Sequence, residues 1–262
     1  MLSYQHLFHA GNPADVHKHA LLSFTLDYLT QKDKPLTYIE THAGRGLYDL
    51  TAPEAEKTGE ARVGVEKLGP LFAKNHPYAQ RLAETRAQFG ERAYPGSPLI
   101  AALSLRDCDT IHLAELHPQE LIALSANLRP WGAHIHSHDG FEMALALSPP
   151  TPRRGLMLID PSYEVKSDYD SIPKHMANIC RKWNVGIVML WYPILTGQTH
   201  LSMIEDLIQR FPNGLSHEVR FSPFHAAHRM VGSGMFIINP PYGLELEARA
   251  VGQLFTRAIA ST

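Results

Sequence analysis

Two short motifs in the chain place a polar side chain, proline and a tyrosine directly after an apolar run. The first is DPSY at residues 160–163, which follows GLMLI, and the second is NPPY at residues 239–242. A carboxylate and a nearby backbone carbonyl can accept both N–H bonds of an aromatic amine, which localises its lone pair and favours the positive charge that develops as it reacts. In the first motif, Asp160 and the Pro161 carbonyl have this chemistry, and Tyr163 can stack on an unstacked base.

Position along the chain distinguishes the two motifs. DPSY follows a predicted strand in the middle of the chain, whereas NPPY follows the last one. Two consecutive prolines cannot extend a hydrogen-bonded ladder, so NPPY is typical of a rigid strand exit. We therefore predict that the reactive site lies at residues 160–163.

Alternating strand and helix patterns predict the framework that positions this motif. Asn12 and Pro13 are typical of a helix N-cap and first helical position, and the helix is expected to reach about Thr30. Near-continuous apolar runs, typical of strands covered on both faces, lie at residues 36–40, 110–116, 133–138, 155–160 and 185–192. Helical segments are expected at 118–128 and 168–183, and an antiparallel pair at 217–223 and 232–241. The pattern predicts an α/β fold, a Rossmann-like, mostly parallel sheet of about seven strands.

The interval after the first strand is too long for an ordinary crossover. Glu40 and Ile111 are about seventy residues apart, whereas a βαβ unit often needs only some 30. The excess, residues 51–93, contains two segments with helical, amphipathic patterns. We predict one domain, residues 1–262, in which residues 51–93 form a helical insertion above the carboxyl edge of the sheet.

Ligands of an open α/β sheet bind where its strands end, so the residues that follow each strand are informative. The first strand ends in THAGRG, residues 41–46, whose small residues allow a close backbone approach. The next two end in Glu115, suited to a ribose diol, and in Asp139-Gly140, suited to an adenine amine. Together with Asp160, this order indicates a site for S-adenosylmethionine (SAM). A dinucleotide site is the nearest alternative, but the turn lacks the third glycine of G-x-G-x-x-G.

Several stretches resemble the RlmJ family of bacterial methyltransferases, which use SAM to methylate the N6 amine of an adenine in 23S ribosomal RNA. They are YQHLFHAGNPADVHKH at 4–19, THAGRG at 41–46, YPGSPL at 94–99, AELHP at 114–118 and GSGMFIINPPY at 232–242. The resemblance implies a SAM pocket lined by His19, His42, Ser97, Glu115, Asp139, Gly140 and Asp160. It implies that Tyr4, His6 and Lys18 approach the target nucleotide, and that residues 160–163 hold the adenine. Ser162 stands where the family has a second proline, which predicts a softer loop.

Some of these residues also fit simpler roles. Ser97 could simply cap a helix that begins at Pro98, a role that can coexist with a SAM contact. Trp191 could form a wall of the base pocket, or it could simply pack against its neighbours. His17 and His19 diverge on a helix, since they are two residues apart, so a shared metal is not expected. His17 is expected to be solvated.

Two other classes of function stay open. HIHSHD, residues 134–139, places three imidazoles on one strand face and resembles ligands of metal-dependent hydrolases. A zinc site needs three or four convergent ligands, whereas methyl transfer by the DPSY motif requires no metal. A non-catalytic RNA-binding protein on a methyltransferase fold is the third class.

Composition limits the partners and the location. A net charge of -2 and a pI near 6.8 argue against a general nucleic-acid binder, so RNA contact requires a local basic patch. Candidates for this patch are Lys18, Arg45, Arg153, Arg154, Lys166 and Arg229. The sequence shows no signal-peptide pattern and no apolar run of membrane-spanning length, and its two cysteines are isolated. These features predict a cytoplasmic protein, with a monomer as the default expectation.

Overall fold

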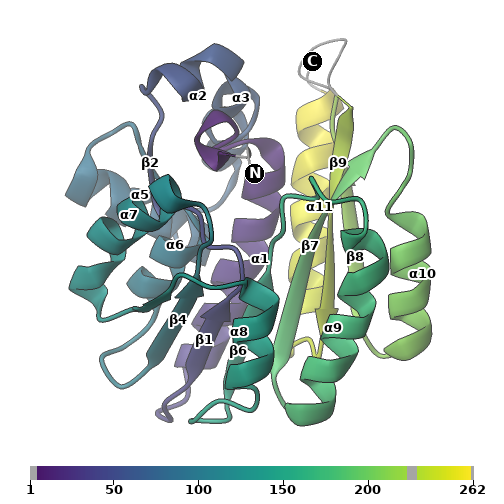
Figure 1. Cartoon of the computed structure of the whole chain (residues 1–262). Helices are drawn as coiled ribbons and strands as arrows, with labels where there is room; N and C mark the ends of the chain where they lie inside the picture. The colour runs from purple at the N-terminus through teal and green to yellow at the C-terminus, as the bar shows by residue number, and fades with distance from the viewer. Residues whose placement is uncertain (1–4, 223–228, 261–262) are drawn as a thin grey trace.

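A seven-stranded sheet forms the centre of the molecule, in the order β5-β4-β1-β6-β7-β9-β8 (Figure 1). The computed structural model describes residues 5–222 and 229–260, with side chains up to Ala258. The strands of this sheet are β1 (Thr37–Glu40), β4 (Thr110–Ala114), β5 (His134–His136), β6 (Gly155–Ile159), β7 (Ile187–Leu195), β8 (Leu215–Arg220) and β9 (Met230–Ile238). The predicted seven-stranded α/β fold is confirmed, and every predicted strand is present.

The directions of the strands identify the edge of the sheet at which a ligand would bind. β5, β4, β1, β6 and β7 are parallel, and β9 runs antiparallel between β7 and β8. The chain leaves β1 toward β4 and β5 on one side, and β6 and β7 lie on the other. The strand order therefore switches between β1 and β6, and their carboxyl ends border the crevice where open sheets bind ligands.

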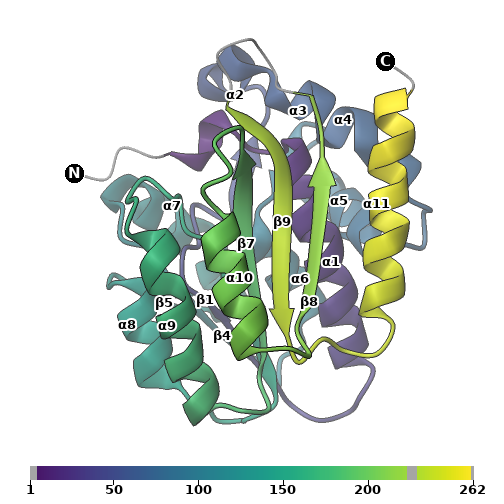
Figure 2. The same ribbon diagram turned by 90° about the vertical axis from the view of Figure 1, so that its right-hand side faces the viewer.

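Helices cover both faces of the sheet (Figure 2). The longer ones are α1 (Pro13–Thr30), α5 (Pro77–Phe89), α6 (Ser97–Ser104), α7 (Pro118–Leu128), α8 (Gly140–Leu147), α9 (Asp168–Lys182), α10 (Leu201–Arg210) and α11 (Leu244–Ala260). One buried cluster joins α1, α6, α7 and α11 to one face, and a second joins α8, α9 and α10 to the other. No helix in the described ranges is long and apolar enough to cross a membrane.

The helix α1 is buried along most of its length. It begins as predicted, because the Asn12 side chain accepts a hydrogen bond from the Asp15 N–H and Pro13 occupies the first turn. It packs against α5, α6, α11 and β9, so its polar residues are enclosed as well. His17 is fully buried, and the expectation that it is solvated was wrong.

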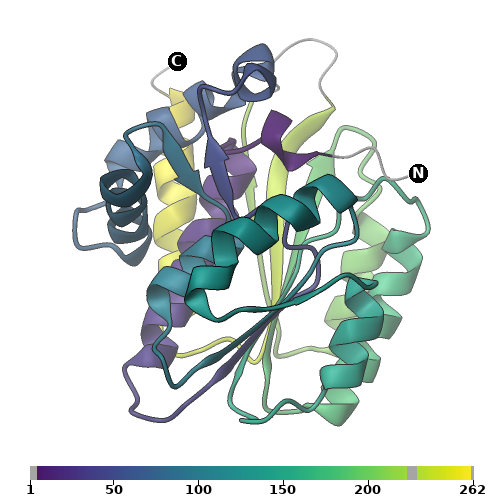
Figure 3. The ribbon, with the colours of Figure 1, turned by 60° about the vertical axis from the view of Figure 1, so that its left-hand side comes forward.

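Residues 51–93 are mainly helical. They contain α2 (Pro53–Thr58), α3 (Glu60–Val63), α4 (Val65–Leu68), a 3-10 turn at Gly69–Leu71, and α5. Figures 1 and 3 show α2 and α3 beyond the carboxyl edge of the sheet, with the rest beside α1. Val65 and Tyr78 are fully buried in the same apolar cluster as α1. The sequence did not predict the short antiparallel pair of β2 (Leu47–Asp49) and β3 (Ala93–Pro95) that flanks the segment.

Candidate active site

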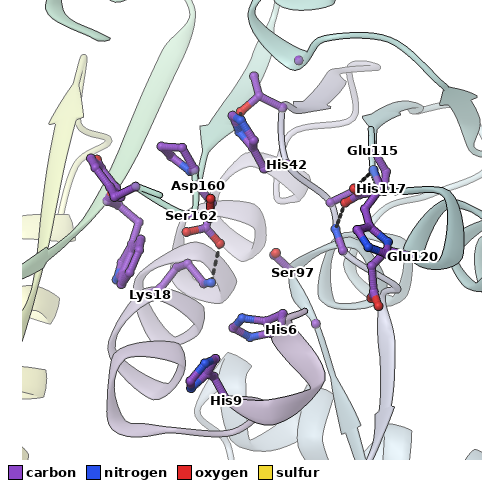
Figure 4. Close-up of a pocket in the computed structure, with 18 of the residues that line it drawn as sticks. His6, His9, Lys18, His42, Ser97, Glu115, His117, Glu120, Asp160 and Ser162 are labelled. Carbon is purple, nitrogen blue, oxygen red and sulfur yellow. Dashed lines mark hydrogen bonds and ion pairs between the residues drawn. The ribbon is translucent and has the colours of Figure 1, made fainter. Parts of the chain in front are cut away.

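A cavity of about 420 Å³ opens at the switch point between β1 and β6, a size typical of small-molecule sites. Its walls come from the ends of β1, β4, β6 and β7, from the start of α1, and from the 3-10 turn η1 (His6–Phe8) (Figure 4). Every predicted site residue within the described ranges lines it: His6, Lys18, His19, His42, Ser97, Glu115, Asp139, Gly140, Asp160, Pro161 and Tyr163. Tyr4 lies outside the described residues.

Glu115 holds the glycine turn after β1 in place. Its two carboxylate oxygens accept the N–H groups of Gly44 at 2.8 Å and His117 at 2.7 Å. Gly44 has φ +60°, and a Cβ there would lie 2.5 Å from the Tyr48 hydroxyl, so the turn requires glycine. Burial raises the pKa of Glu115. The N–H groups around it do not use all of the carboxylate's acceptor positions, so it can still accept from a ribose hydroxyl.

The start of α8, which follows β5, lies close to the turn that follows β1. Asp139 caps α8 by accepting the N–H groups of Phe141 at 2.9 Å and Glu142 at 3.0 Å. A Cβ on Gly140 would lie only 1.9 Å from the Thr41 carbonyl oxygen, so no side chain fits at this contact. Burial lowers the pKa of His42 to about 4, which leaves a neutral imidazole beside the Gly-rich turn.

Ser97 binds a buried carboxyl group that sequence reasoning missed. Its hydroxyl donates to Glu40 Oε1, and the Tyr38 hydroxyl donates to Glu40 Oε2 at 2.8 Å. Burial raises the pKa of Glu40 to about 8. The interpretation of Ser97 as a helix cap was wrong, because Gly96 is the N-cap. The only signal in the sequence was the spacing of Tyr38 and Glu40, which puts both on one strand face.

Lys18 links α1 to the predicted reactive loop. Its ammonium lies 2.5 Å from Asp160 Oδ2 (Figure 4). It also lies 3.1 Å from Asp15 Oδ1. Burial alone would lower the pKa of Lys18, but the charges of Asp160 and Asp15 raise it above its ordinary value. The ammonium is therefore retained at neutral pH although its side chain is almost fully enclosed.

Asp15 is a second site residue that sequence reasoning missed. It accepts the Gly11 N–H and pairs with His6 Nε2, both at 2.9 Å. Burial opposes its ionisation, but the charges of His6 and Lys18 and the hydrogen bond with His6 hold its pKa well below the usual range. Its spacing of three and four from Lys18 and His19 places all three on one helix face, which was the available signal.

His19 lines the cavity and has a buried nitrogen without a hydrogen-bond partner in the described chain. Its Nδ1 lies 2.9 Å from the Tyr94 hydroxyl, and its buried Nε2 has no hydrogen-bond partner. The nearest carboxylate oxygen, on Asp15, is 3.9 Å away, which is too long for a hydrogen bond. Burial lowers the pKa of His19 to about 3. A neutral imidazole with an open polar atom is suited to a ligand contact.

The DPSY loop is anchored at both ends. Asp160 bonds to Lys18, and the Tyr163 hydroxyl donates to the Trp191 carbonyl at 2.8 Å. Tyr163 has φ 56°, a strained conformation for a residue other than glycine. Trp191 lines the cavity, as expected if it forms a wall of the base pocket. Within the described residues, the hydrogen bond of the Ser162 hydroxyl is a long one of 3.5 Å from the Glu164 N–H.

NPPY lies at the opposite edge of the sheet, after the end of β9 (Figure 2). The Asn239 side chain donates to the carbonyls of Asn184 at 3.0 Å and Gly186 at 2.8 Å. Tyr242 is 87% exposed and none of the four residues lines the cavity. The motif ends a strand, in agreement with its interpretation as a rigid exit.

The six candidate cations do not form one patch. Lys18 is enclosed, and Arg45 is paired with Glu120 through two hydrogen bonds, at 2.9 and 2.5 Å. Arg153 and Arg154 precede β6 at the amino edge, where Arg154 bonds to backbone carbonyls. Three of the six are exposed: Arg153 at the amino edge, and Lys166, in the loop after DPSY, and Arg229, which precedes β9, at the carboxyl edge.

The strand histidines contact one another at the edge of the sheet. His112 Nδ1 lies 3.2 Å from His136 Nε2, and the ring of His112 stacks on that of His134. Across residues 5–222 and 229–260, no three His, Cys, Asp or Glu side chains are arranged to hold a metal ion.

Comparisons with known proteins agree with this geometry. Residues 33–262 match a family model described as "Ribosomal RNA large subunit methyltransferase D, RlmJ". The chain is similar to two proteins named ribosomal RNA large subunit methyltransferase J. The Escherichia coli protein is 40% identical over 96% of this chain and 91% of the relative, and the Haemophilus influenzae protein is 36% identical over 99% and 94%. A crystal structure of a Legionella pneumophila protein is 34% identical, with a TM-score of 0.86 over 96% of this chain and 94% of that one.

Proposed function

The chain belongs to the RlmJ family of ribosomal RNA large subunit methyltransferases, and from that premise we propose that it methylates the N6 amine of an adenine in 23S rRNA, with SAM as methyl donor. One observation carries the proposal. The DPSY loop opens on the same cavity as the three strand ends suited to SAM. We propose a cytoplasmic location, because a ribosomal RNA substrate would be found there.

The cavity's residues fit SAM. We assign the ribose to the Glu115 carboxylate and the adenine to Asp139 and Gly140, which line the same cavity. His19 offers a buried nitrogen without a partner in the described chain. His42, Ser97 and Asp160 complete the wall. SAM, when bound, supplies a methyl group on a positively charged sulfur, which an amine can attack in line.

We assign the acceptor side of the reaction to Asp160 and Pro161. Lys18 occupies one oxygen of the Asp160 carboxylate. The other oxygen and the Pro161 carbonyl accept the two N–H bonds of the target amine. That arrangement localises the lone pair, and Asp160 takes the proton after transfer. Tyr163 holds the base by stacking, with its ring fixed through its hydroxyl.

RNA contact requires groups at the mouth of the cavity rather than a broad basic surface. His6 lines the cavity, and Lys166 and Arg229 are exposed at the same edge. We assign the phosphate contacts to Lys166 and Arg229, whereas Lys18 acts inside the pocket. Phosphate contacts make affinity depend on salt, and two such contacts predict a shallow dependence.

The test is transfer of labelled methyl from SAM to unmodified 23S rRNA, followed by nucleoside analysis with and without a metal chelator. We expect N6-methyladenosine at equal yield in both samples, and loss of the product with Asp160→Ala. Loss of activity with the chelator would favour a metal-dependent enzyme. SAM binding without transfer would identify a non-catalytic RNA-binding protein.

A further inference from the structure

A line of hydrogen bonds runs from Trp191 at the cavity into the buried side of α1. The Trp191 indole Nε1 lies 2.9 Å from Ser233 Oγ on β9. Ser233 Oγ lies 2.9 Å from His17 Nδ1, and His17 Nε2 lies 2.9 Å from His217 Nδ1 on β8. Ser233 and His17 are both fully buried. Four elements that are far apart in the sequence therefore share one polar network.

The chemistry of the groups fixes the direction of this network. An indole N–H can only donate, so Ser233 Oγ accepts from Trp191. The Ser233 hydroxyl has one proton, and its hydrogen-bond partner in the described chain, apart from that indole, is His17 Nδ1. A buried hydroxyl proton is normally hydrogen-bonded, so we assign the Ser233 hydroxyl as the donor to His17 Nδ1. In this assignment His17 carries its proton on Nε2 and donates to His217. Burial lowers the pKa of His17, which is consistent with the neutral form this direction needs.

Trp191 connects this network to the groups assigned to the target base. Its ring lines the cavity, and the Lys18 ammonium lies 5.7 Å from its ring centroid. Its carbonyl accepts the Tyr163 hydroxyl, and the two rings meet edge to face at 6.0 Å. A change in the tilt of the indole would therefore move the surroundings of both Lys18 and Tyr163.

We propose that Ser233, held by His17, is a positioning residue for the target adenine: it fixes the plane of the Trp191 indole that walls the base pocket. The inference rests on the function proposed above and extends it to residues that do not line the cavity. Ser233 acts on the base through Trp191 and touches neither substrate. The network lies on the side of the cavity formed by β7 and α1, away from Glu115 and Asp139.

The test compares Ser233→Ala, Trp191→Phe and the double variant with the wild-type enzyme. Loss of a hydrogen bond of about 0.5–1.5 kcal/mol predicts a rise of about 2- to 10-fold in the KM for RNA with Ser233→Ala. SAM affinity, measured by calorimetry, is expected to stay unchanged. Trp191→Phe removes the donated N–H, so adding Ser233→Ala to it is expected to have no further effect on kcat/KM.

Each other outcome overturns the inference. Equal losses in SAM affinity and RNA KM would mean that Ser233 serves the fold generally, and so would independent, multiplying effects in the double variant. Should Ser233→Ala fail to fold, Trp191→Phe alone still decides, because an unchanged KM for RNA would remove the indole N–H from base positioning. A wild-type enzyme that transfers no methyl group would refute the proposed function itself and this inference with it.

Discussion

Replacing Glu40 by glutamine is expected to change how stability depends on pH. Glu40 is fully buried at the end of β1, and burial raises its pKa to about 8. In the unfolded chain the same group titrates near its ordinary value of 4.5. Between these two values the folded state binds a proton that the unfolded state has released. Stability therefore falls as pH rises through this range.

The size of the effect follows from the two pKa values. One pH unit corresponds to about 1.4 kcal/mol for a single proton, so Glu40 disfavours folding by about 3 kcal/mol at pH 7 and by about 1 kcal/mol at pH 5. Glutamine has nearly the shape of the protonated acid, with an amide that can donate to one neighbour and an oxygen that accepts from another. Tyr38 and Ser97 supply those partners. The variant should keep the fold and lose this pH dependence.

Urea denaturation at several pH values between 5 and 8 measures the difference. We expect the unfolding free energy of Glu40→Gln minus that of the wild-type protein to increase by about 2 kcal/mol from pH 5 to pH 7. Glu205→Gln, at an exposed site on α10, is the matched control and should give a constant difference. A constant difference for Glu40→Gln as well would show that Glu40 is ionised in the folded protein, and would refute the reasoning.

Three further predictions concern the cavity. Glu115→Ala should weaken SAM binding by about 1–3 kcal/mol in calorimetry, because it removes a charged acceptor; unchanged affinity would exclude Glu115 from the ribose site. Asp160→Ala should abolish methylation in the labelled-methyl assay and Asn239→Ala should retain it, and the reverse order would move the active site to NPPY. Ser162→Pro should be tolerated, with a single-turnover rate at least equal to that of the wild type; a large loss would show that the serine makes a needed hydrogen bond.

The strand ends were predictable because parallel strands end at one edge of a sheet. Reading the residue after each apolar run was enough to bring Glu115, Asp139 and Asp160 to one cavity without knowledge of the strand order. The N-terminus of α1 was equally readable, since an Asn-Pro pair supplies both the cap and the first helical position. These features depend on residues that are adjacent in the sequence.

The surroundings of α1 could not be predicted in the same way. A helix with one apolar stripe is expected to expose its polar residues, and that expectation failed for His17. The helix lies between β9, α11 and the helical insertion, so nearly every side is covered. Its polar residues bond to groups as distant in sequence as Ser233 and Asp160. Only the tertiary arrangement reveals these partners.

The same arrangement bears on Ser162, the position at which the resemblance predicts a second proline. Proline at the third position would stiffen the loop locally by restricting its backbone. Here Lys18 holds Asp160 from α1, and the Tyr163 hydroxyl is held by the carbonyl of Trp191. Because both ends of the loop are fixed by contacts outside it, the residue between them has little freedom left to lose. A serine at position 162 therefore costs the loop little rigidity, because the contacts of Asp160 and Tyr163 already restrict its backbone.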